Sequence, residues 1–169
     1  ATQGGLGIKR HTFADNDDWI ETAYYAVDGK QSSDASGVPI VKIEYDKYGN
    51  RIKESYVNAQ GELVLRTDVR ASGFTYKYNE WGDRIVQSYF GLDGKPCYGS
   101  DGLARADWKF DNNGYVSEIA YYDVDGNPCM LANGVARFVC RNDEHGNQVE
   151  QLFYDLDGEL TLSSDGYAR

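Results

Sequence analysis

The chain has 169 residues, of which 41% are hydrophobic and 14% aromatic, and it carries a formal net charge of −10. This charge argues against nucleic acid and anionic membrane surfaces as partners, because both are bound through patches of Lys and Arg. No apolar run approaches the roughly 20 residues that a membrane-spanning helix needs, so we expect no membrane span. The 19 Gly and 14 Tyr are typical of many short strands separated by tight turns.

Glycine recurs along the chain at a fixed interval. One set lies at steps of 32, 33, 32 and 32 residues: Gly29, Gly61, Gly94, Gly126 and Gly158. A second set keeps the same interval, with Asp17 in the equivalent position of the first copy: Gly49, Gly82, Gly114 and Gly146. A third set opens each copy, with Arg70 in place of glycine in copy three: Gly5, Gly37, Gly102, Gly134 and Gly166. A period of this length predicts a tandem repeat architecture.

These markers divide a single repeat domain, residues 1–169, into five copies and a partial sixth. The copies are 5–36, 37–69, 70–101, 102–133, 134–165 and 166–169. The last segment, Gly166-Tyr167-Ala168-Arg169, matches the start of copy four, Gly102-Leu103-Ala104-Arg105. We therefore expect the array either to continue in a longer protein or to meet another molecule at its open end.

Each copy reads as three strands. The first alternates apolar and polar residues, which predicts one buried and one solvent-facing side. Its apolar members are Val41, Ile43 and Tyr45 in copy two, Phe74, Tyr76 and Tyr78 in copy three, and Ala106, Trp108 and Phe110 in copy four. The second strand ends in an aromatic pair or its near equivalent: Tyr24-Tyr25, Tyr56-Val57, Tyr89-Phe90, Tyr121-Tyr122 and Phe153-Tyr154. The third is short, as at 62–65, 96–98 and 128–131.

Both turns of each copy have the composition of β-hairpins. In Asp46-Lys47-Tyr48-Gly49 the aspartate caps a type I turn and the glycine supplies the left-handed residue. The sequence therefore predicts an all-β fold, an elongated tandem array of antiparallel β-hairpins with almost no helix. The alternative is a β-solenoid, in which equivalent residues stack about 4.8 Å apart. A solenoid would place Cys97 and Cys129 within disulfide range.

Few residues could carry catalytic or metal chemistry. His11 and His145, the only histidines, have no Ser, Cys or carboxylate partner at a diagnostic spacing. Cys140 occupies a strand position and is most simply a small core residue. The Asp-x-Asp-Gly turns contain hard oxygen ligands, but they lack the further ligands and the distal Glu of a calcium loop. We expect no enzymatic activity, no metal and no cofactor.

The aromatic pairs are the candidate binding residues. Adjacent residues of a strand point to opposite faces, so one aromatic of each pair faces outward. Repeated exposed aromatics can stack on sugar rings or contribute to a partner interface. The candidates are Tyr25, Phe90, Tyr122 and Tyr154, together with Trp19 and Trp81 near turns. The alternative is that these side chains form cross-strand ladders that stabilise the sheet.

Two sets of motifs resemble known repeat families. The segment Tyr45-Asp46-Lys47-Tyr48-Gly49-Asn50-Arg51-Ile52 resembles the YD (RHS-type) repeat, and Tyr78-Asn79-Glu80-Trp81-Gly82-Asp83-Arg84-Ile85 does so with Asn in place of Asp. The segments Tyr24–Gly29 and Tyr121–Gly126 resemble choline- and glucan-binding cell-wall repeats. These families build β-hairpin arrays on bacterial surfaces, so the resemblance implies an extracellular or cell-surface location.

We therefore expect a non-enzymatic repeat module of a secreted or cell-surface bacterial protein. Such a module would act as a structural spacer, an adhesive segment or a unit that self-associates end to end into a fibre, because a repeat array leaves strand edges that a like molecule can pair with. One alternative is a carbohydrate-binding module with a cell-surface glycan as its partner. The other is a segment of an RHS-like toxin casing.

Overall fold

The computed structural model describes residues 7–162, which contain ten β-strands and no helix. The expected marker Gly5, the end of copy five and the partial sixth copy at 166–169 lie outside the described residues. The strands are β1 (Ile8–Phe13), β2 (Trp19–Tyr25), β3 (Ile40–Tyr45), β4 (Arg51–Val57), β5 (Gly73–Tyr78), β6 (Arg84–Phe90), β7 (Arg105–Phe110), β8 (Val116–Tyr122), β9 (Arg137–Asn142) and β10 (Gln148–Tyr154).

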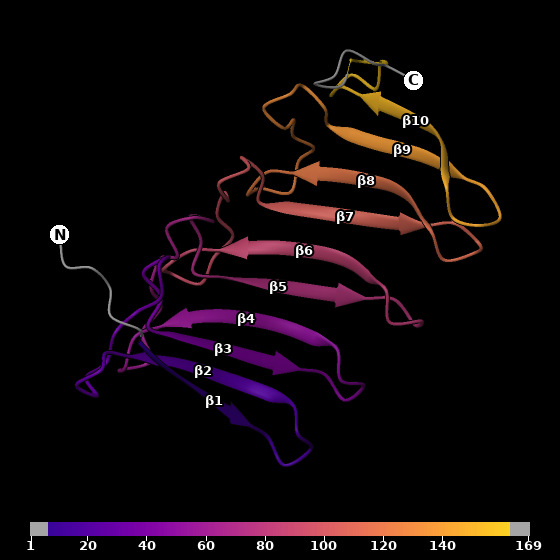
Figure 1. The fold of residues 1–169 in the computed structure, drawn as a ribbon. Coiled ribbons are helices and arrows are strands. Elements are labelled where there is room, and N and C mark those ends of the chain that lie inside the picture. The colour runs from indigo at the N-terminus through magenta and orange to yellow at the C-terminus, as the bar shows by residue number, and fades with distance from the viewer. Residues whose placement is uncertain (1–6, 163–169) are drawn as a thin grey trace. The chain divides into compact units, whose positions relative to one another are not determined.

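The chain divides into two compact units. The first comprises the chain up to Tyr76 together with Tyr89–Cys97, and the second comprises Lys77–Ser88 and the chain from Tyr98 onward. Each strand pairs antiparallel with the next from β1 to β5 in the first unit and from β6 to β10 in the second (Figure 1). The expected all-β array of antiparallel hairpins is confirmed. The β-solenoid alternative is wrong, because consecutive strands run in opposite directions.

An aspartate or asparagine organises each hairpin turn. In the β3–β4 turn, Asp46 Oδ1 accepts hydrogen bonds from the backbone N–H groups of Tyr48 and Asn50, both at 2.9 Å. Asp46 Oδ2 also accepts a hydrogen bond from the Asn50 side chain at 3.0 Å. These bonds, that from the Asn50 side chain foremost, lower the pKa of Asp46. The strand register shifts by one residue beside the turn, as expected of a bulged hairpin.

The marker positions coincide with left-handed backbone. Within residues 7–162, the only residues other than glycine with positive φ are Asp17, at 64°, and Arg70, at 56°. These are the two residues that replace glycine in the repeat pattern. Aspartate visits this conformation at little cost, whereas the Cβ of an arginine is crowded there. The two positions at which the repeat lacks its glycine therefore have left-handed backbone, and Arg70 is the strained one of the two.

Replacing Arg70 with glycine is expected to raise the free energy of unfolding by about 0.5–1 kcal/mol, because the left-handed conformation is then unstrained. Asp17→Gly should give a smaller gain, since aspartate tolerates this region better. Gly37→Ala is the matched opposite: Gly37 has φ +84° and only one side-chain atom, 4.0 Å away, near the position of an added Cβ. Its expected loss of about 1 kcal/mol is then purely conformational. Urea denaturation measures the free energy of unfolding of all three variants. A lower value for Arg70→Gly than for the unmodified protein would contradict the assignment of backbone strain to Arg70.

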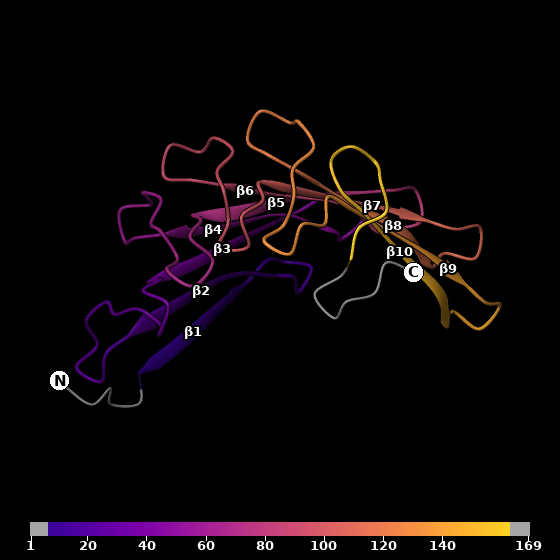
Figure 2. The ribbon, with the colours of Figure 1, turned by 90° about the horizontal axis from the view of Figure 1, so that it is seen from above.

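The prediction of a third strand in each copy is wrong, because the segment after each even-numbered strand forms only a single β-bridge. The bridges occur at Tyr25–Gln31, Val57–Leu63, Phe90–Pro96, Tyr122–Pro128 and Tyr154–Leu160. In copy two, Tyr56 O accepts from Val64 N at 2.9 Å while Tyr56 N donates to Ser72 O at 2.9 Å. The same edge of β4 is thus shared with the segment that precedes β5, and β5 itself pairs with this edge from Ser55 to Lys53. The returning segment has no ladder left to extend and becomes a loop, as the loop after β8 shows (Figure 2).

The core of the first unit lies on one face of its strands. Val38, Val41, Ile43 and Tyr56 are buried there, and Trp19, Tyr24, Tyr45, Val64, Val69 and Phe74 pack against them. Val64 and Val69 belong to the loop after β4, so the loop covers the face that the alternation of β3 predicts to be buried. The expected inward orientation of Val41 and Ile43 is confirmed.

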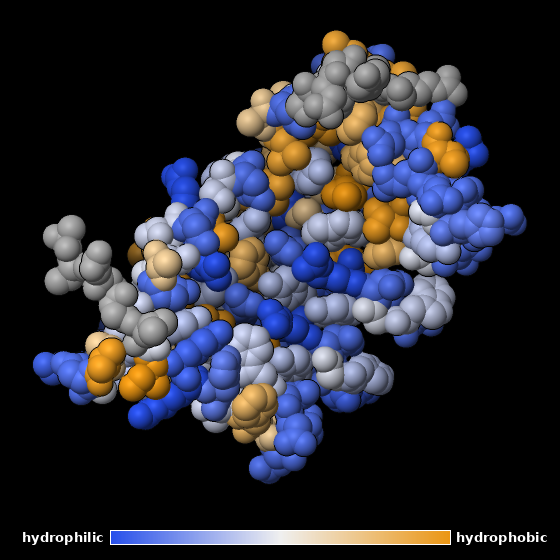
Figure 3. All heavy atoms as spheres, viewed as in Figure 1, coloured by the Kyte–Doolittle hydropathy of each residue, from blue (hydrophilic) through white to orange (hydrophobic). Residues whose placement is uncertain are grey.

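The second unit is packed with smaller side chains. Its buried hydrophobic residues are Leu103, Ala104, Ala106, Val135, Ala136 and Cys140. Apolar side chains gather over β7 and β8 (Figure 3). Phe138 and Phe153 meet across β9 and β10 with ring centroids 5.4 Å apart. Because few large side chains are fully buried, this unit leaves more of its strand surface open.

Candidate functional site

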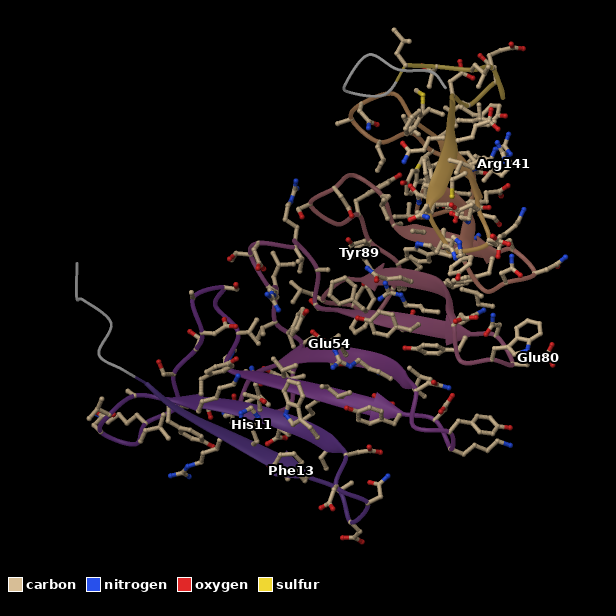
Figure 4. The ribbon with its side chains drawn as sticks, turned by 45° about the vertical axis from the view of Figure 1, so that its right-hand side comes forward. His11, Phe13, Glu54, Glu80, Tyr89 and Arg141 are labelled. Atoms are coloured by element: carbon tan, nitrogen blue, oxygen red, sulfur yellow. The ribbon has the colours of Figure 1, made fainter. Side chains whose placement is uncertain are left out.

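The second unit contains a groove between two neighbouring hairpin turns. Its volume is about 730 Å³, within the range typical of small-molecule sites. One wall is the β5–β6 turn, with Asn79, Trp81 and Asp83, and the other is the β7–β8 turn, residues 111–114. Strands β6 and β7 form the floor. Figure 4 shows the β5–β6 turn, with Glu80 pointing away from the strands at its tip.

Two tryptophans line this groove. Trp81 is 79% exposed, which makes it the most exposed aromatic side chain in the described part of the chain. Trp108 lies on β7, and the guanidinium of Arg84 stands 5.0 Å from its ring centroid. The groove is thus lined by one exposed and one half-buried indole, and an apolar ring surface of this kind can stack against a ligand.

The polar side chains that line the groove are three aspartates, three asparagines and one lysine: Asp83, Asp107, Asp111, Asn79, Asn112, Asn113 and Lys109. Asp83 accepts a hydrogen bond from Asn79 at 3.0 Å, and Asp107 pairs with Arg105 at 2.8 Å. Asp111 accepts from the backbone N–H groups of Tyr115 and Asn113, and these bonds, that from Tyr115 foremost, lower its pKa. Three carboxyl groups against a single lysine disfavour an anionic ligand, and the carboxyl and amide groups beside two indoles suit a neutral, hydroxyl-rich one.

The sequence identified Trp81 as a candidate but not Trp108. Trp108 was expected only as a member of the buried side of its strand. Trp108 follows Asp107, which pairs with Val86 in the β6–β7 ladder. Trp108 lines the groove together with residues of the β5–β6 and β7–β8 turns. The two turns are about 32 residues apart in the sequence. No local sequence pattern indicates that they lie side by side in the structure.

Three of the expected outward aromatics are half-buried and covered by arginine. The guanidinium lies over the ring at 4.7 Å for Arg10 and Tyr25, 4.0 Å for Arg105 and Tyr122, and 4.2 Å for Arg137 and Tyr154. Arg105 and Arg137 stand directly opposite their tyrosines in the ladder. These are cation–π pairs between neighbouring strands, and they support the cross-strand ladder as the role of these tyrosines.

Phe90 was expected to face solvent, but it does not. It is only 6% exposed. The position opposite it, occupied by arginine in copies four and five, is Gly73, and an added Cβ on Gly73 would lie 2.4 Å from the Phe90 ring. The ring therefore fills the space that a side chain at position 73 would need. Phe90 is a packing residue, which the aromatic pattern could not distinguish from its exposed equivalents.

Trp19 is also anchored within the fold rather than displayed near a turn. Its indole N–H donates to Glu21 O at 2.9 Å, and its ring packs against the core of the first unit. Arg51 lies 5.9 Å from its ring centroid. Of the six predicted aromatics, Trp81 alone combines high exposure with a place in the groove.

A network of polar groups runs from the buried Tyr56 of the first unit to the exposed Asp68. The Tyr56 hydroxyl donates to Glu54 Oε1 at 2.8 Å and accepts from Arg66 at 3.4 Å. Arg66 in turn makes two hydrogen bonds to Asp68, at 2.8 and 3.0 Å, which lower the pKa of Asp68 to about 2. Burial, and then the adjacent Glu54 carboxylate, raise the pKa of Tyr56. Tyr56 is fully buried, and through Arg66 the network ties the loop after β4 to the sheet.

The histidines and cysteines are separate from the groove. His11 Nδ1 and Thr22 Oγ1 are 2.8 Å apart across β1 and β2, and His145 lies exposed in the β9–β10 turn. All three cysteines are free thiols, and burial raises the pKa of each. No cluster of three or more His, Cys, Asp or Glu with metal-binding geometry occurs in residues 7–162.

Comparison of the sequence with models of known protein families gives no match, and comparison with curated proteins gives none either. The similarity to YD repeats and to choline- or glucan-binding repeats therefore remains an expectation based on short motifs. Between residues 7 and 162, no helix is long and apolar enough to cross a bilayer.

Proposed function

We propose that this chain is a non-enzymatic structural repeat module that self-associates, placed outside the cell or on its surface. The location rests on the motif resemblance alone. The structural and self-associating role rests on how neighbouring copies are joined. An array whose every junction has the same geometry can accept one more copy without any new kind of contact.

The observation that carries the proposal is the uniform register of the junctions. Three consecutive residues of each even strand pair with three of the next odd strand: 21–23 with 40–42, 53–55 with 73–75, 86–88 with 105–107, and 118–120 with 137–139. These positions are equivalent in the repeat. The side chains differ from junction to junction, so the register comes from the backbone ladder and from the loop after each even strand.

Sedimentation velocity and negative-stain imaging of the full chain test this role. The expected result is a mean mass that rises with protein concentration at about 150 mM salt, where the Debye length of about 8 Å screens most of the net repulsion between like molecules. A strictly monomeric protein across the micromolar to millimolar range would overturn the self-associating role.

Saccharide binding is the second candidate function, and the groove with Trp81 favours it. An exposed indole that can stack on a pyranose ring, next to carboxylate and amide oxygens that can accept hydrogen bonds from hydroxyls, suits a neutral oligosaccharide. The adhesive role would then reside in this groove of the second unit rather than in every copy.

Replacing Trp81 with alanine is expected to weaken saccharide binding at least tenfold, because the stacking surface is removed. The matched control is Tyr48→Ala. Tyr48 is the equivalent residue of copy two, 75% exposed, but it belongs to the other unit and does not line the groove. Glycan arrays of neutral tetrasaccharides, followed by calorimetry, provide the measurement. Equal losses in both variants, or no binding by the unmodified protein, would remove this candidate.

A further inference from the structure

The second unit contains two junctions of the same kind, and the residues that close one of them are replaced at the other (Figure 1). The groove lies at the first, between the β5–β6 and β7–β8 turns, where β6 meets β7. The second lies between the β7–β8 and β9–β10 turns, where β8 meets β9. Both have the same strand register, 86–88 with 105–107 and 118–120 with 137–139, so their residues correspond one to one.

A tyrosine closes the second junction. The ring of Tyr115 lies over Gly146 of the facing turn, so that a Cβ added to Gly146 would be 2.5 Å from Tyr115 Cε1. The equivalent residues of the first junction are Asp83 and Gly114. Apart from its neighbours in the chain, no described atom lies within 4 Å of a Cβ placed on Gly114. The shorter aspartate thus leaves open, over Gly114, the space that a six-membered ring fills at the next junction.

A side-chain amide also ties the second junction together. Asn142, at the end of β9, donates from Nδ2 to Val116 O at 2.8 Å and to Asp111 Oδ2 at 3.2 Å, both in the preceding hairpin. The equivalent residue at the end of β7 is Phe110, whose side chain has no donor. At the groove, an aspartate and a phenylalanine therefore replace the two side chains that close the second junction.

A second hollow adjoins the groove at these two residues. Its volume is about 440 Å³, and it shares Asp83, Trp108 and Phe110 with the lining of the groove. Both spaces lie between the same two hairpins, and each is within the size range of small-molecule sites. A ligand longer than one ring could therefore occupy both. The rest of the lining of the hollow consists of Tyr78, Gly82, Arg84 and Val116.

The side chains shared by the two spaces suit a hydroxylated ring. Asp83 Oδ2 accepts a hydrogen bond from Asn79 at 3.0 Å, whereas Oδ1 accepts none in the described part of the chain. An ionised carboxylate only accepts hydrogen bonds, so Oδ1 suits a donor such as a hydroxyl. Trp108 and Phe110 line both spaces and add apolar ring surface against which a pyranose can pack.

We propose that the groove and the adjoining hollow form one site for a linear neutral oligosaccharide. One pyranose ring lies over Gly114 beside Trp81, the next lies in the hollow beside Phe110, and Asp83 accepts hydrogen bonds from hydroxyls where the two spaces meet. This inference rests on the proposed saccharide binding and specifies its subsites. Asp83 is the specificity-determining residue, because tyrosine at the same position closes the equivalent junction.

The length of the ligand tests the pair of subsites. Three neutral series serve as probes, of β-1,4-linked glucose, α-1,4-linked glucose and β-1,4-linked mannose, each as monosaccharide, disaccharide and tetrasaccharide. In calorimetry with the full chain, the disaccharide of a series that binds is expected to bind about tenfold more tightly than its monosaccharide, because it fills both spaces. Equal affinities for monosaccharide and disaccharide would overturn the paired subsites.

Replacing Asp83 with tyrosine introduces the residue that closes the next junction. This variant is expected to weaken disaccharide binding about tenfold without lowering the free energy of unfolding, since the new ring covers Gly114 as Tyr115 covers Gly146. The matched control is Asp83→Asn, which keeps the length of the side chain and one acceptor. Its expected loss is only about threefold, because a charge-assisted hydrogen bond becomes a neutral one.

The fluorescence of Trp108 tests the closure without any ligand. With Trp19 and Trp81 replaced by phenylalanine, Trp108 is the only indole of the chain. Adding Asp83→Tyr is expected to lower its quenching by acrylamide about twofold, because the groove beside its ring is then filled. Adding Asp83→Asn should leave the quenching unchanged.

The outcomes separate this inference from the saccharide-binding candidate. Unchanged quenching in Asp83→Tyr would overturn the ring subsite over Gly114. Reduced quenching with undiminished disaccharide binding would overturn the placement of the ligand while leaving saccharide binding in place. Absence of binding by the unmodified protein in all three series would overturn both.

Discussion

Replacing Tyr56 with alanine is expected to lower the free energy of unfolding of the first unit by about 3–5 kcal/mol, the loss typical of a large buried side chain. Tyr56 is fully buried, belongs to the core with Val38, Val41 and Ile43, and lies edge-on to Phe74 with centroids 6.3 Å apart. Its removal leaves a cavity and also leaves Glu54 without the hydroxyl that bonds it. Urea unfolding followed by Trp19 fluorescence, with Trp81 and Trp108 replaced by phenylalanine, reports on this unit alone.

Tyr56→Phe separates packing from the polar network. It retains the ring and removes only the hydroxyl between Glu54 and Arg66, so the expected loss is about 1–2 kcal/mol. Equal losses for alanine and phenylalanine would show that the network, and not the buried ring, carries the stability. A loss below about 1 kcal/mol for alanine would contradict the placement of Tyr56 in the core.

Gly73→Ala should destabilise the first unit by about 3 kcal/mol, the upper part of the range for overpacking a closed site. An added Cβ would lie 2.1 Å from the Glu54 carbonyl oxygen and 2.4 Å from the Phe90 ring. The ring could turn aside, but the carbonyl belongs to the backbone of β4, which is paired with β5. The same denaturation assay measures the change.

Two variants define what the Gly73 result means. Arg105→Ala, at the equivalent position of β7, removes a cation–π contact and should cost only about 0.5–1 kcal/mol. Gly73→Ala combined with Phe90→Leu should recover part of the loss, because one of the two clashes is relieved. Full recovery would place the entire conflict at Phe90, and no loss in the single variant would contradict the close approach of β4 and β5.

The strand and turn pattern was predictable because it depends on neighbours in sequence. Period-two alternation identified Val41 and Ile43 as buried, and the glycine spacing identified the turns, including the two positions where Asp17 and Arg70 adopt left-handed backbone. Both signals act within a few residues. The third strand failed as a prediction because its length depends on competition for one edge of β4, where β5 arrives from further along the chain.

The groove was predictable only in part. Trp81 could be identified from its place beside a turn glycine, where a side chain points outward. The burial of Phe90 could not, because it depends on whether the residue opposite is Gly73 or an arginine, and that pairing joins different strands. The groove forms only because the turns after β5 and β7 lie side by side. This arrangement brings Trp81 and Trp108 to the same groove.

By itself, the amino-acid sequence determined the repeat, the hairpin turns and the side of each strand that turns inward, because left-handed glycines and alternating side chains act through local backbone geometry. Only the tertiary structure decided which outward aromatics are covered, where the returning segment stops, and that two turns enclose a groove. These features depend on contacts between residues about 17 to 33 positions apart. Whether a side chain is covered in such a contact depends on the residue opposite it on the neighbouring strand as well as on the side chain itself.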